Sequence, residues 1–172
     1  MQIDCGDFFL RPLRMSDKES LTRNANNRKI WCTVRDRFPH PYTLQDAEEF
    51  LRPREQALPV TDFCIEYKQE CIGCIGIIPQ TDVYRRSAEI GYWLGEPFWG
   101  KGIATRAVQQ LSAHVFQQSD VIRLYACIFA GNTASGRVLE KAGFRLEGIG
   151  RNAVFKDGQV LDEHRYALLK EL

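Results

Sequence analysis

The order of the segments between residues 87 and 129 restricts the fold more than any other feature of this chain. Residues 87–94 alternate between the two faces of a strand, and residues 123–129 are strand-like again. Between them, a glycine-containing loop leads into a run whose apolar side chains recur at helical spacing: Ala104, Ala107, Val108, Leu111 and Val115. A strand, a helix and a strand in this order predict two parallel neighbours in one sheet.

The flanking segments predict antiparallel hairpins and further helices. Ser16 and Glu19 are expected to open a first helix as a capping box, Thr43 to cap a second, and Gly143 to end a short last helix that starts at Asn132. Strands are expected at 8–13, 63–67, 72–78, 144–155 and 160–169. The resulting order, βααβββαβαββ, predicts one α+β domain over residues 1–172. Its sheet is mixed and mostly antiparallel, with about seven strands and helices on both faces.

The composition excludes several classes of function. The 172 residues carry 23 Lys and Arg against 22 Asp and Glu, a net charge of +1, so no basic excess indicates nucleic-acid binding. No segment approaches the roughly 18 uninterrupted apolar residues that a membrane span requires. The N-terminus also lacks the basic start and apolar stretch of a signal peptide. The sequence therefore predicts a cytoplasmic protein that binds neither nucleic acid nor a membrane.

The cysteines raise the question of a metal or redox site. Cys71 and Cys74 have the spacing of half a zinc site or of a redox pair, but no second pair with suitable spacing accompanies them. Because the surrounding residues alternate like a strand, the two side chains are expected to point to opposite faces of the sheet. We therefore expect that the cysteines bind no metal. Their thiols are expected to stay reduced and to pack as small buried side chains.

The loop at residues 96–105 carries the strongest functional signal. It joins a strand to a helix, and backbone N–H groups at such a helix start bind phosphate or pyrophosphate. An ordinary turn shaped by its glycines is one alternative. A Walker A loop over residues 95–101 is another, but Gly102 stands where a hydroxyl must ligate Mg²⁺. A pyrophosphate cradle of the pattern Q/R-x-x-G-x-G/A fits residues 99–104 better, with Trp99 in its first position.

The cradle and its flanking segments resemble the GNAT N-acetyltransferases, and in particular their RimJ/RimL-like branch of ribosomal-protein N-terminal acetyltransferases. The similar segments follow one another along nearly the whole chain: Leu10–Leu13, Phe38–Thr43, Ala88–Leu94, Phe98–Thr105, Asn132–Ser135, Leu139–Phe144 and Glu147–Gly148. This resemblance implies the GNAT fold, in which two neighbouring parallel central strands splay apart. Here these would be the strands at residues 87–94 and 123–129.

The resemblance also implies acetyl-CoA as co-substrate, lying in the gap between the splayed strands. Backbone groups of Trp93 and Leu94 would pair with the pantetheine arm, much as an added strand would. The side chain of Asn132 would reach the same arm, although Asn132 also fits a plain N-cap of the helix that follows it. The pyrophosphate would be bound by the amides of Gly100, Lys101, Gly102, Ile103, Ala104 and Thr105.

Acetyl transfer to an amine needs a neutral nucleophile, a stabilised oxyanion and a proton for the leaving thiolate. Glu89 lies on the strand beside the expected thioester and is the candidate base, although a structural carboxylate paired with Arg85 or Arg86 fits the sequence as well. Many relatives protonate the thiolate with a tyrosine seven residues after the asparagine, where this chain has Leu139. The resemblance instead points to Ser135, which also fits an ordinary first-turn helix serine.

Two functions fit these residues. The first is an acetyl-CoA-dependent N-acetyltransferase, which transfers the acetyl group to a primary amine by direct attack in a ternary complex. The amine would belong to a protein N-terminus, a small amine or an amino sugar. The second is a non-catalytic acyl-CoA-binding or sensing module, because Leu139 and Val154 replace polar groups that relatives use. The segments 28–43 and 150–165 would line the acceptor pocket without a motif that identifies the acceptor, and a homodimer is a further expectation from relatives.

Overall fold

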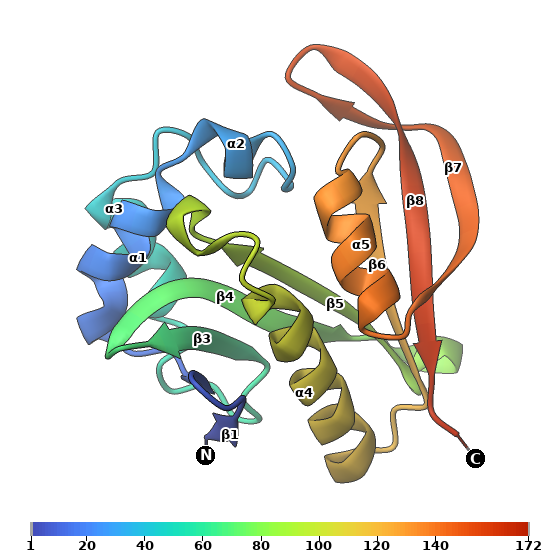
Figure 1. Ribbon diagram of the computed structural model, residues 1–172, viewed down its shortest axis with the longest axis horizontal. Coiled ribbons are helices and arrows are strands. Elements are labelled where there is room, and N and C mark those ends of the chain that lie inside the picture. Colours follow the sequence, from blue (N-terminus) through green and yellow to red (C-terminus); the bar gives the residue numbers. More distant parts are fainter. Residues whose placement is uncertain (1, 172) are drawn as a thin grey trace.

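A mixed eight-stranded sheet runs through the protein in the order β1-β2-β3-β4-β5-β6-β8-β7 (Figure 1). The structure is a computed structural model and describes residues 2–171. Only β5 and β6 are parallel to each other, among neighbouring strands in this described part. The strands are β1 (Ile3–Asp4), β2 (Phe9–Pro12), β3 (Asp62–Tyr67), β4 (Glu70–Pro79), β5 (Ser87–Leu94), β6 (Arg123–Phe129), β7 (Arg145–Lys156) and β8 (Gln159–Leu169).

The predicted α+β class and the parallel central pair are confirmed. The sheet has eight strands instead of about seven, because the two-residue β1 pairs with β2 at its edge. Such a short strand leaves no alternation that the sequence could show.

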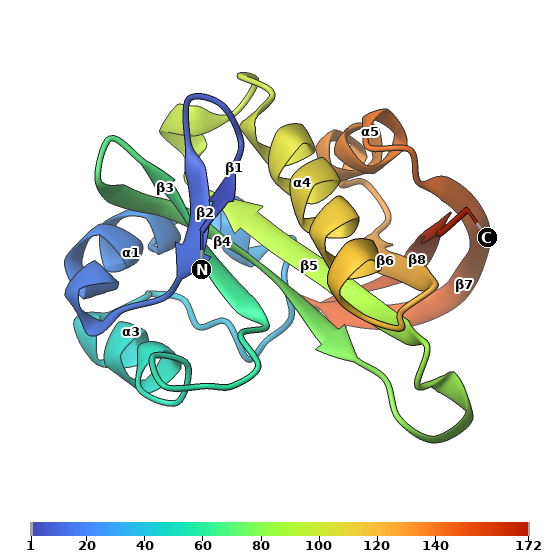
Figure 2. The same cartoon turned by 90° about the horizontal axis from the view of Figure 1, so that it is seen from below.

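Helices cover both faces of the sheet, as predicted (Figure 2). On one face, α4 and α5 contribute Leu111 and Leu139 to the main core cluster; on the other, α1 and α3 contribute Leu21 and Leu51 to a second cluster. No helix within residues 2–171 is both long and apolar enough to cross a membrane. The helices are α1 (Lys18–Ala25), α2 (Arg28–Trp31), α3 (Leu44–Leu51), α4 (Ile103–Gln118) and α5 (Thr133–Lys141).

The predicted cap of the second long helix is confirmed. The Thr43 hydroxyl accepts a hydrogen bond from the Asp46 N–H at 3.2 Å, and the Asp46 carboxylate accepts one from the Thr43 N–H at 2.7 Å. This reciprocal pair satisfies two backbone donors that the first turn of α3 would otherwise leave unpaired. The four-residue α2, which precedes it, was not expected, since four residues are too few to show a helical period.

The predicted capping box of Ser16 and Glu19 is wrong. A single 3-10 turn at Met15–Asp17 precedes α1, and Asp17 accepts a hydrogen bond from the Arg14 N–H at 2.9 Å. Asp17 therefore takes the role that was expected of Glu19, two residues earlier in the chain. The physical reason is tertiary, because the same carboxylate is also fixed by a buried arginine from β2.

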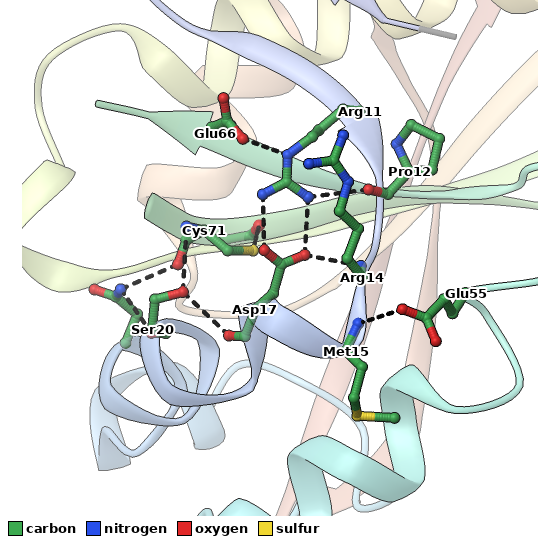
Figure 3. Close-up of polar contacts among 11 residues, drawn as sticks. Arg11, Pro12, Arg14, Met15, Asp17, Ser20, Glu55, Glu66 and Cys71 are labelled. Carbon is green, nitrogen blue, oxygen red and sulfur yellow. Dashed lines mark hydrogen bonds and ion pairs between the residues drawn. The ribbon is translucent and has the colours of Figure 1, made fainter. Parts of the chain in front are cut away.

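That arginine is Arg11, which joins β2 to the start of α1 and to β3 (Figure 3). Its Nη1 and Nη2 groups donate to the two carboxylate oxygens of Asp17 at 2.8 and 2.7 Å, and its Nε donates to Glu66. Arg11 is 5% exposed and Asp17 is 4% exposed. The bond to Asp17 raises the pKa of Arg11 above its ordinary value, although burial acts in the opposite direction. Both charges are thus compensated inside the protein.

Cys71 and Cys74 lie on the same face of the sheet, and the expectation that they point to opposite faces is wrong. A β-bulge in the pairing of β3 with β4 leaves Ile72 without an opposite residue. This extra residue reverses the alternation of the strand. Ile72 consequently packs in the main core cluster, whereas Cys71 and Cys74 pack with Cys64 in the second cluster.

Candidate active site

β5 and β6 separate after a short paired stretch, which covers Ser87–Glu89 on β5 and Arg123–Tyr125 on β6. Beyond it the two strands diverge (Figure 1), while β5 stays paired with β4 as far as Leu94 and β6 stays paired with β8 as far as Phe129. The facing edges of β5 and β6 therefore carry backbone groups that no strand pairs, and such edges bind extended, amide-containing molecules. The splayed central strands that the resemblance implied are confirmed.

A row of backbone donors lies at the end of β5, where the chain turns into α4. The Arg106 N–H is the first in the helix to bond back along the chain, to the Gly102 carbonyl at 3.1 Å. Within the described residues, the N–H groups of residues 100–105 donate to no backbone carbonyl. We call these groups the amide row. They lie at the positive end of a 16-residue helix, a position that favours an anion.

The shape of the amide row depends on two glycines. Gly100 and Gly102 both have φ of +74°, a conformation that favours glycine. A Cβ atom added at either position would meet nothing within 4 Å, so the space beside the amides is open. The other side of the loop is fixed by Trp99, whose indole Nε1 donates to the Leu94 carbonyl at 2.7 Å.

The remaining residues of the amide row are divided between core and surface. Ile103 is buried in the main cluster, and Ala104 packs partly against it. Thr105 is half-buried, and Lys101 is exposed with its Nζ donating to the Pro97 carbonyl at 2.8 Å. The Lys101 ammonium is therefore bonded to the backbone of the preceding loop.

Trp93 and Leu94 end β5 beside the splay. The Trp93 carbonyl faces β4 so closely that a Cβ atom added at Gly73 would lie 2.4 Å from it. The Trp93 ring meets the Phe38 ring edge-on, with 5.6 Å between the centroids. The Leu94 side chain is buried, and its carbonyl holds the Trp99 indole. A contact of either backbone with a pantetheine arm stays a prediction.

A cavity of about 610 Å³ lies where the two strands diverge. Its walls come from the loop between α2 and α3, from α3 itself, from the strands β3, β4, β5, β6 and β8, and from the start of α5. Glu89, Ser135 and Asn132 all line it, although β5 and α5 are far apart in the sequence. The cavity therefore brings the two candidate catalytic residues and the candidate pantetheine ligand to one place.

Glu89 forms an ion pair with Arg35, which comes from the loop between α2 and α3. The Arg35 Nη2 donates to Glu89 Oε1; the Glu89 side chain is 17% exposed and the Arg35 side chain 51% exposed. This bond raises the pKa of Arg35 above its ordinary value. The alternative that paired Glu89 with Arg85 or Arg86 is wrong, since the side chains of those two arginines bond to backbone carbonyls elsewhere.

Asn132 and Ser135 belong to one capped helix start. Asn132 Oδ1 accepts a hydrogen bond from the Ser135 N–H at 3.2 Å, which confirms the N-cap interpretation of Asn132. The Ser135 hydroxyl lies 2.7 Å from the hydroxyl of Tyr92 on β5, and the same phenol lies 3.2 Å from the Ser135 carbonyl. Burial raises the pKa of Tyr92 to about 12. Sequence reasoning missed this contact, because Tyr92 belongs to the apolar face of its strand.

Other residues that the resemblance singled out lie away from the cavity. Leu139 is 0% exposed in the main core cluster, and Val154 is half-buried opposite Leu161 in the β7–β8 hairpin. Glu163 of β8 also lines the cavity, with the Arg165 guanidinium 3.8 Å from its carboxylate, and further carboxylates of the lining are Asp46, Glu49 and Asp62. No pattern in the sequence distinguishes Glu163 from the other polar residues of its strand.

The splayed parallel pair, the amide row after β5 and the adjoining cavity together define the GNAT class of fold. In agreement, the family model described as acetyltransferase (GNAT) domain matches residues 7–145. The chain belongs to this family.

Relatives and solved structures agree with this assignment. YdaF of Bacillus subtilis (strain 168), provisionally named a ribosomal N-acetyltransferase, is 39% identical over 89 residues, which cover 52% of this chain and 49% of YdaF. Ribosomal-protein-serine acetyltransferase of Escherichia coli (strain K12) is 34% identical over 105 residues, 61% of this chain and 58% of that protein. The chain thus spans about half the length of these curated relatives. RimJ of Mycobacterium smegmatis, solved with CoA-disulfide, superimposes with a TM-score of 0.83 at 28% identity, covering 98% of this chain and 84% of RimJ.

Proposed function

We propose that this protein is an acetyl-CoA-dependent N-acetyltransferase, acting through a single domain over residues 1–172. The observation that carries the proposal is the amide row, with no protein acceptor, at the open end of the splayed β5 and β6. An anion and an extended amide-containing arm would be bound side by side there, and coenzyme A carries both. Membership of the GNAT family supports the same co-substrate.

The residues present fit coenzyme A. The pyrophosphate would be bound by the N–H groups of residues 100–105, where the two glycines leave the space open. The arm would lie between β5 and β6, beside Leu94 and the Asn132 amide, with its thioester near the cavity. Because backbone N–H groups would make most of the contacts with the pyrophosphate, the proposed site would need little net positive charge and no metal.

The chemistry would then be a direct attack of an amine on the thioester in a ternary complex. Glu89 would accept the proton of the incoming ammonium, because its carboxylate lies in the cavity wall. Ser135, which lines the cavity from α5, would donate a hydrogen bond to the leaving sulfur. The acetyl carbon gains a bond to nitrogen and loses its bond to sulfur. The nitrogen loses two protons, one to Glu89 before attack and one to solvent as the tetrahedral intermediate collapses. After release, the thiolate gains one proton from solvent, and Glu89 returns its own proton to solvent.

The acceptor would be a primary amine, either a protein N-terminus or a small amine. An E. coli relative is named for a ribosomal-protein serine, which supports a protein N-terminus. The aromatic rings of Phe38, Tyr42 and Trp93 in the cavity wall would contact the residue that carries the amine. The six free cysteines suit the reducing cytosol, the compartment that we propose.

A non-catalytic acyl-CoA-binding module is the second candidate, and one observation favours it. The Glu89 carboxylate is already bonded to Arg35, so the candidate base has a partner before any amine arrives. In such a module, coenzyme A would bind without any turnover that depends on an acceptor.

Thiol release separates the two candidates. Acetyl-CoA would be incubated with the protein and a panel of small amines and N-terminal peptides, and the free thiol followed with DTNB. Release that depends on one class of acceptor supports the transferase. Tight coenzyme A binding without acceptor-dependent release across the panel would support the module instead. Equal thermal stabilisation by ATP-Mg and by coenzyme A would contradict both.

A further inference from the structure

The polar groups on the α5 side of the cavity form a connected pair. Of the residues that line the cavity, Thr33, Tyr42, Tyr92 and Ser135 carry hydroxyl groups. Tyr92 and Ser135 contact each other at 2.7 Å between hydroxyl oxygens. Tyr92 comes from β5 and Ser135 from the first turn of α5, so the contact bridges the strand and the helix on either side of the proposed thioester position.

Each hydroxyl has one proton to donate and two lone pairs to accept with, so the pair has two arrangements. In the first, Ser135 donates to Tyr92, and Tyr92 donates to the Ser135 carbonyl at 3.2 Å. In the second, Tyr92 donates to Ser135 Oγ, and the proton of Ser135 is free to point elsewhere in the cavity. Both arrangements use atoms that are already within reach, so changing between them requires only rotation of two hydroxyl protons.

We propose that Tyr92 is a positioning residue for Ser135, whose phenol donates to Ser135 Oγ so that the serine proton is directed to the sulfur that leaves as the acetyl group is transferred. This inference rests on the proposed function and adds a role that the sequence did not indicate. As the C–S bond breaks, its electron pair moves to sulfur, and the growing negative charge favours the second arrangement. The serine proton stays on Ser135 as a hydrogen-bond donor, so neither residue changes its net protonation.

The surroundings of the pair support this role. Burial raises the pKa of Tyr92 to about 12, which keeps the phenol protonated and able to donate through the working range of an enzyme. The Asn132 cap holds the first turn of α5, so the position of Ser135 within the helix start is fixed. Leu139, one helical turn further on, is fully buried and offers no polar group to the cavity. A partnered serine is also a better-oriented donor than a solitary one, because neighbouring hydrogen bonds polarise each other.

The test compares Tyr92→Phe, Ser135→Ala and the double variant, with Tyr84→Phe as the control. Tyr84 is 69% exposed and lies outside the cavity, so its variant should match the wild type. Tyr92→Phe keeps the buried ring and is expected to lower kcat about tenfold without changing KM for acetyl-CoA, as loss of one neutral hydrogen bond would. Ser135→Ala should cost more, about a hundredfold. The double variant should be no slower than Ser135→Ala, because the phenol acts only through the serine.

A binding measurement reports on the same donor without turnover. Dissociation constants for coenzyme A and for desulfo-coenzyme A would be measured at pH 7 and at pH 9.5, where more of the thiol is ionised. The wild type and Tyr84→Phe should gain a preference for coenzyme A at the higher pH, about fivefold to tenfold, because a hydrogen bond stabilises the thiolate. Tyr92→Phe and Ser135→Ala should show little or no gain.

The outcomes separate the two proposals. Additive effects on kcat, or a Tyr92→Phe variant that keeps the pH-dependent preference for coenzyme A, would show that Tyr92 only packs against α5, and would overturn the inference. A wild-type protein that binds coenzyme A but acetylates no amine would refute the proposed activity, while the comparison with desulfo-coenzyme A would still decide the role of Tyr92. A wild type that shows no preference at either pH would also overturn the inference.

Discussion

The Arg35 guanidinium is bonded to the Glu89 carboxylate, and the two side chains come from segments 54 residues apart. Both residues line the cavity; the Glu89 side chain is mostly buried, whereas the Arg35 side chain comes from a loop and is half-exposed. A cationic amine bound at Glu89 would therefore lie beside the positive charge of Arg35. This arrangement allows the base and the charge beside it to be tested separately.

Glu89→Gln is expected to lower kcat by roughly a hundredfold to ten-thousandfold, the range typical for loss of a general base. The amide keeps the size of the side chain, so the affinity for coenzyme A should stay within twofold of the wild type. Steady-state kinetics and calorimetric titration with coenzyme A check the two parts. Glu163→Gln is the matched comparison, since this glutamate also lines the cavity. A larger loss of kcat in Glu163→Gln than in Glu89→Gln would show that Glu163, and not Glu89, is the general base.

Arg35→Met is expected to lower KM for a cationic acceptor, by roughly fivefold at low salt, because a nearby like charge costs about 1 kcal/mol in water. The difference should shrink in 1 M salt, where the screening length falls to about 3 Å. Arg28→Met is the control, since Arg28 pairs with Asp157 at 2.6 Å and does not line the cavity. A KM that rises in Arg35→Met would contradict repulsion. It would mean that Arg35 binds a negative group elsewhere on the same acceptor.

Gly102→Ala is expected to weaken coenzyme A binding at least tenfold, which is about 1.4 kcal/mol. The methyl group would occupy the open space beside the amide row, and positive φ adds backbone strain. Gly158→Ala separates the two causes, because Gly158 has φ of +75° in the β7–β8 turn, far along the chain from the amide row, and equally open surroundings. Urea unfolding and calorimetry measure the two effects. If both variants lose the same unfolding free energy but only Gly102→Ala loses affinity for coenzyme A, the result supports pyrophosphate binding at the amide row. Unchanged affinity in Gly102→Ala would place the pyrophosphate elsewhere.

Gly73→Ala is expected to destabilise the protein by about 1–3 kcal/mol, the usual cost of overpacking a tight site. The added Cβ would lie 2.4 Å from the Trp93 carbonyl and 3.0 Å from the Leu94 Cα, both of which are backbone atoms. Because the end of β5 must move to relieve this contact, coenzyme A affinity should fall as well. Gly148→Ala, whose Cβ would meet nothing within 4 Å, should change the unfolding free energy by less than about 0.5 kcal/mol. Similar urea midpoints for both variants would contradict the close packing of β4 on β5.

Asp17→Asn is expected to cost about 3–5 kcal/mol of unfolding free energy, because it leaves the buried Arg11 charge poorly compensated. Glu70→Gln removes an exposed partner of Arg23 at 3.1 Å and should cost no more than about 1 kcal/mol. Urea unfolding followed by tryptophan fluorescence measures both. A small loss in Asp17→Asn would mean that Glu66 alone can balance Arg11.

Much of the architecture could be predicted because it depends on neighbours in the chain. The alternation of residues 87–94, the Thr43 cap and the stop at Gly143 each involve contacts within a few residues, and each is confirmed. The Ser16 cap and the orientation of Cys71 were wrong for the opposite reason. A buried arginine from β2 fixes Asp17, and a bulge in the pairing with β3 reverses the faces of β4, so both outcomes depend on residues distant in the sequence.

The sequence by itself determined the family, the order of the elements and the position of the amide row, since two glycines and the start of a helix are local features. The tertiary structure decided which side chains face one another in the cavity. Arg35 meets Glu89, and Tyr92 meets Ser135, because folding brings a loop and a helix against β5. Local patterns report on backbone conformation and burial, whereas these contacts depend on how separate elements pack, which no short segment encodes.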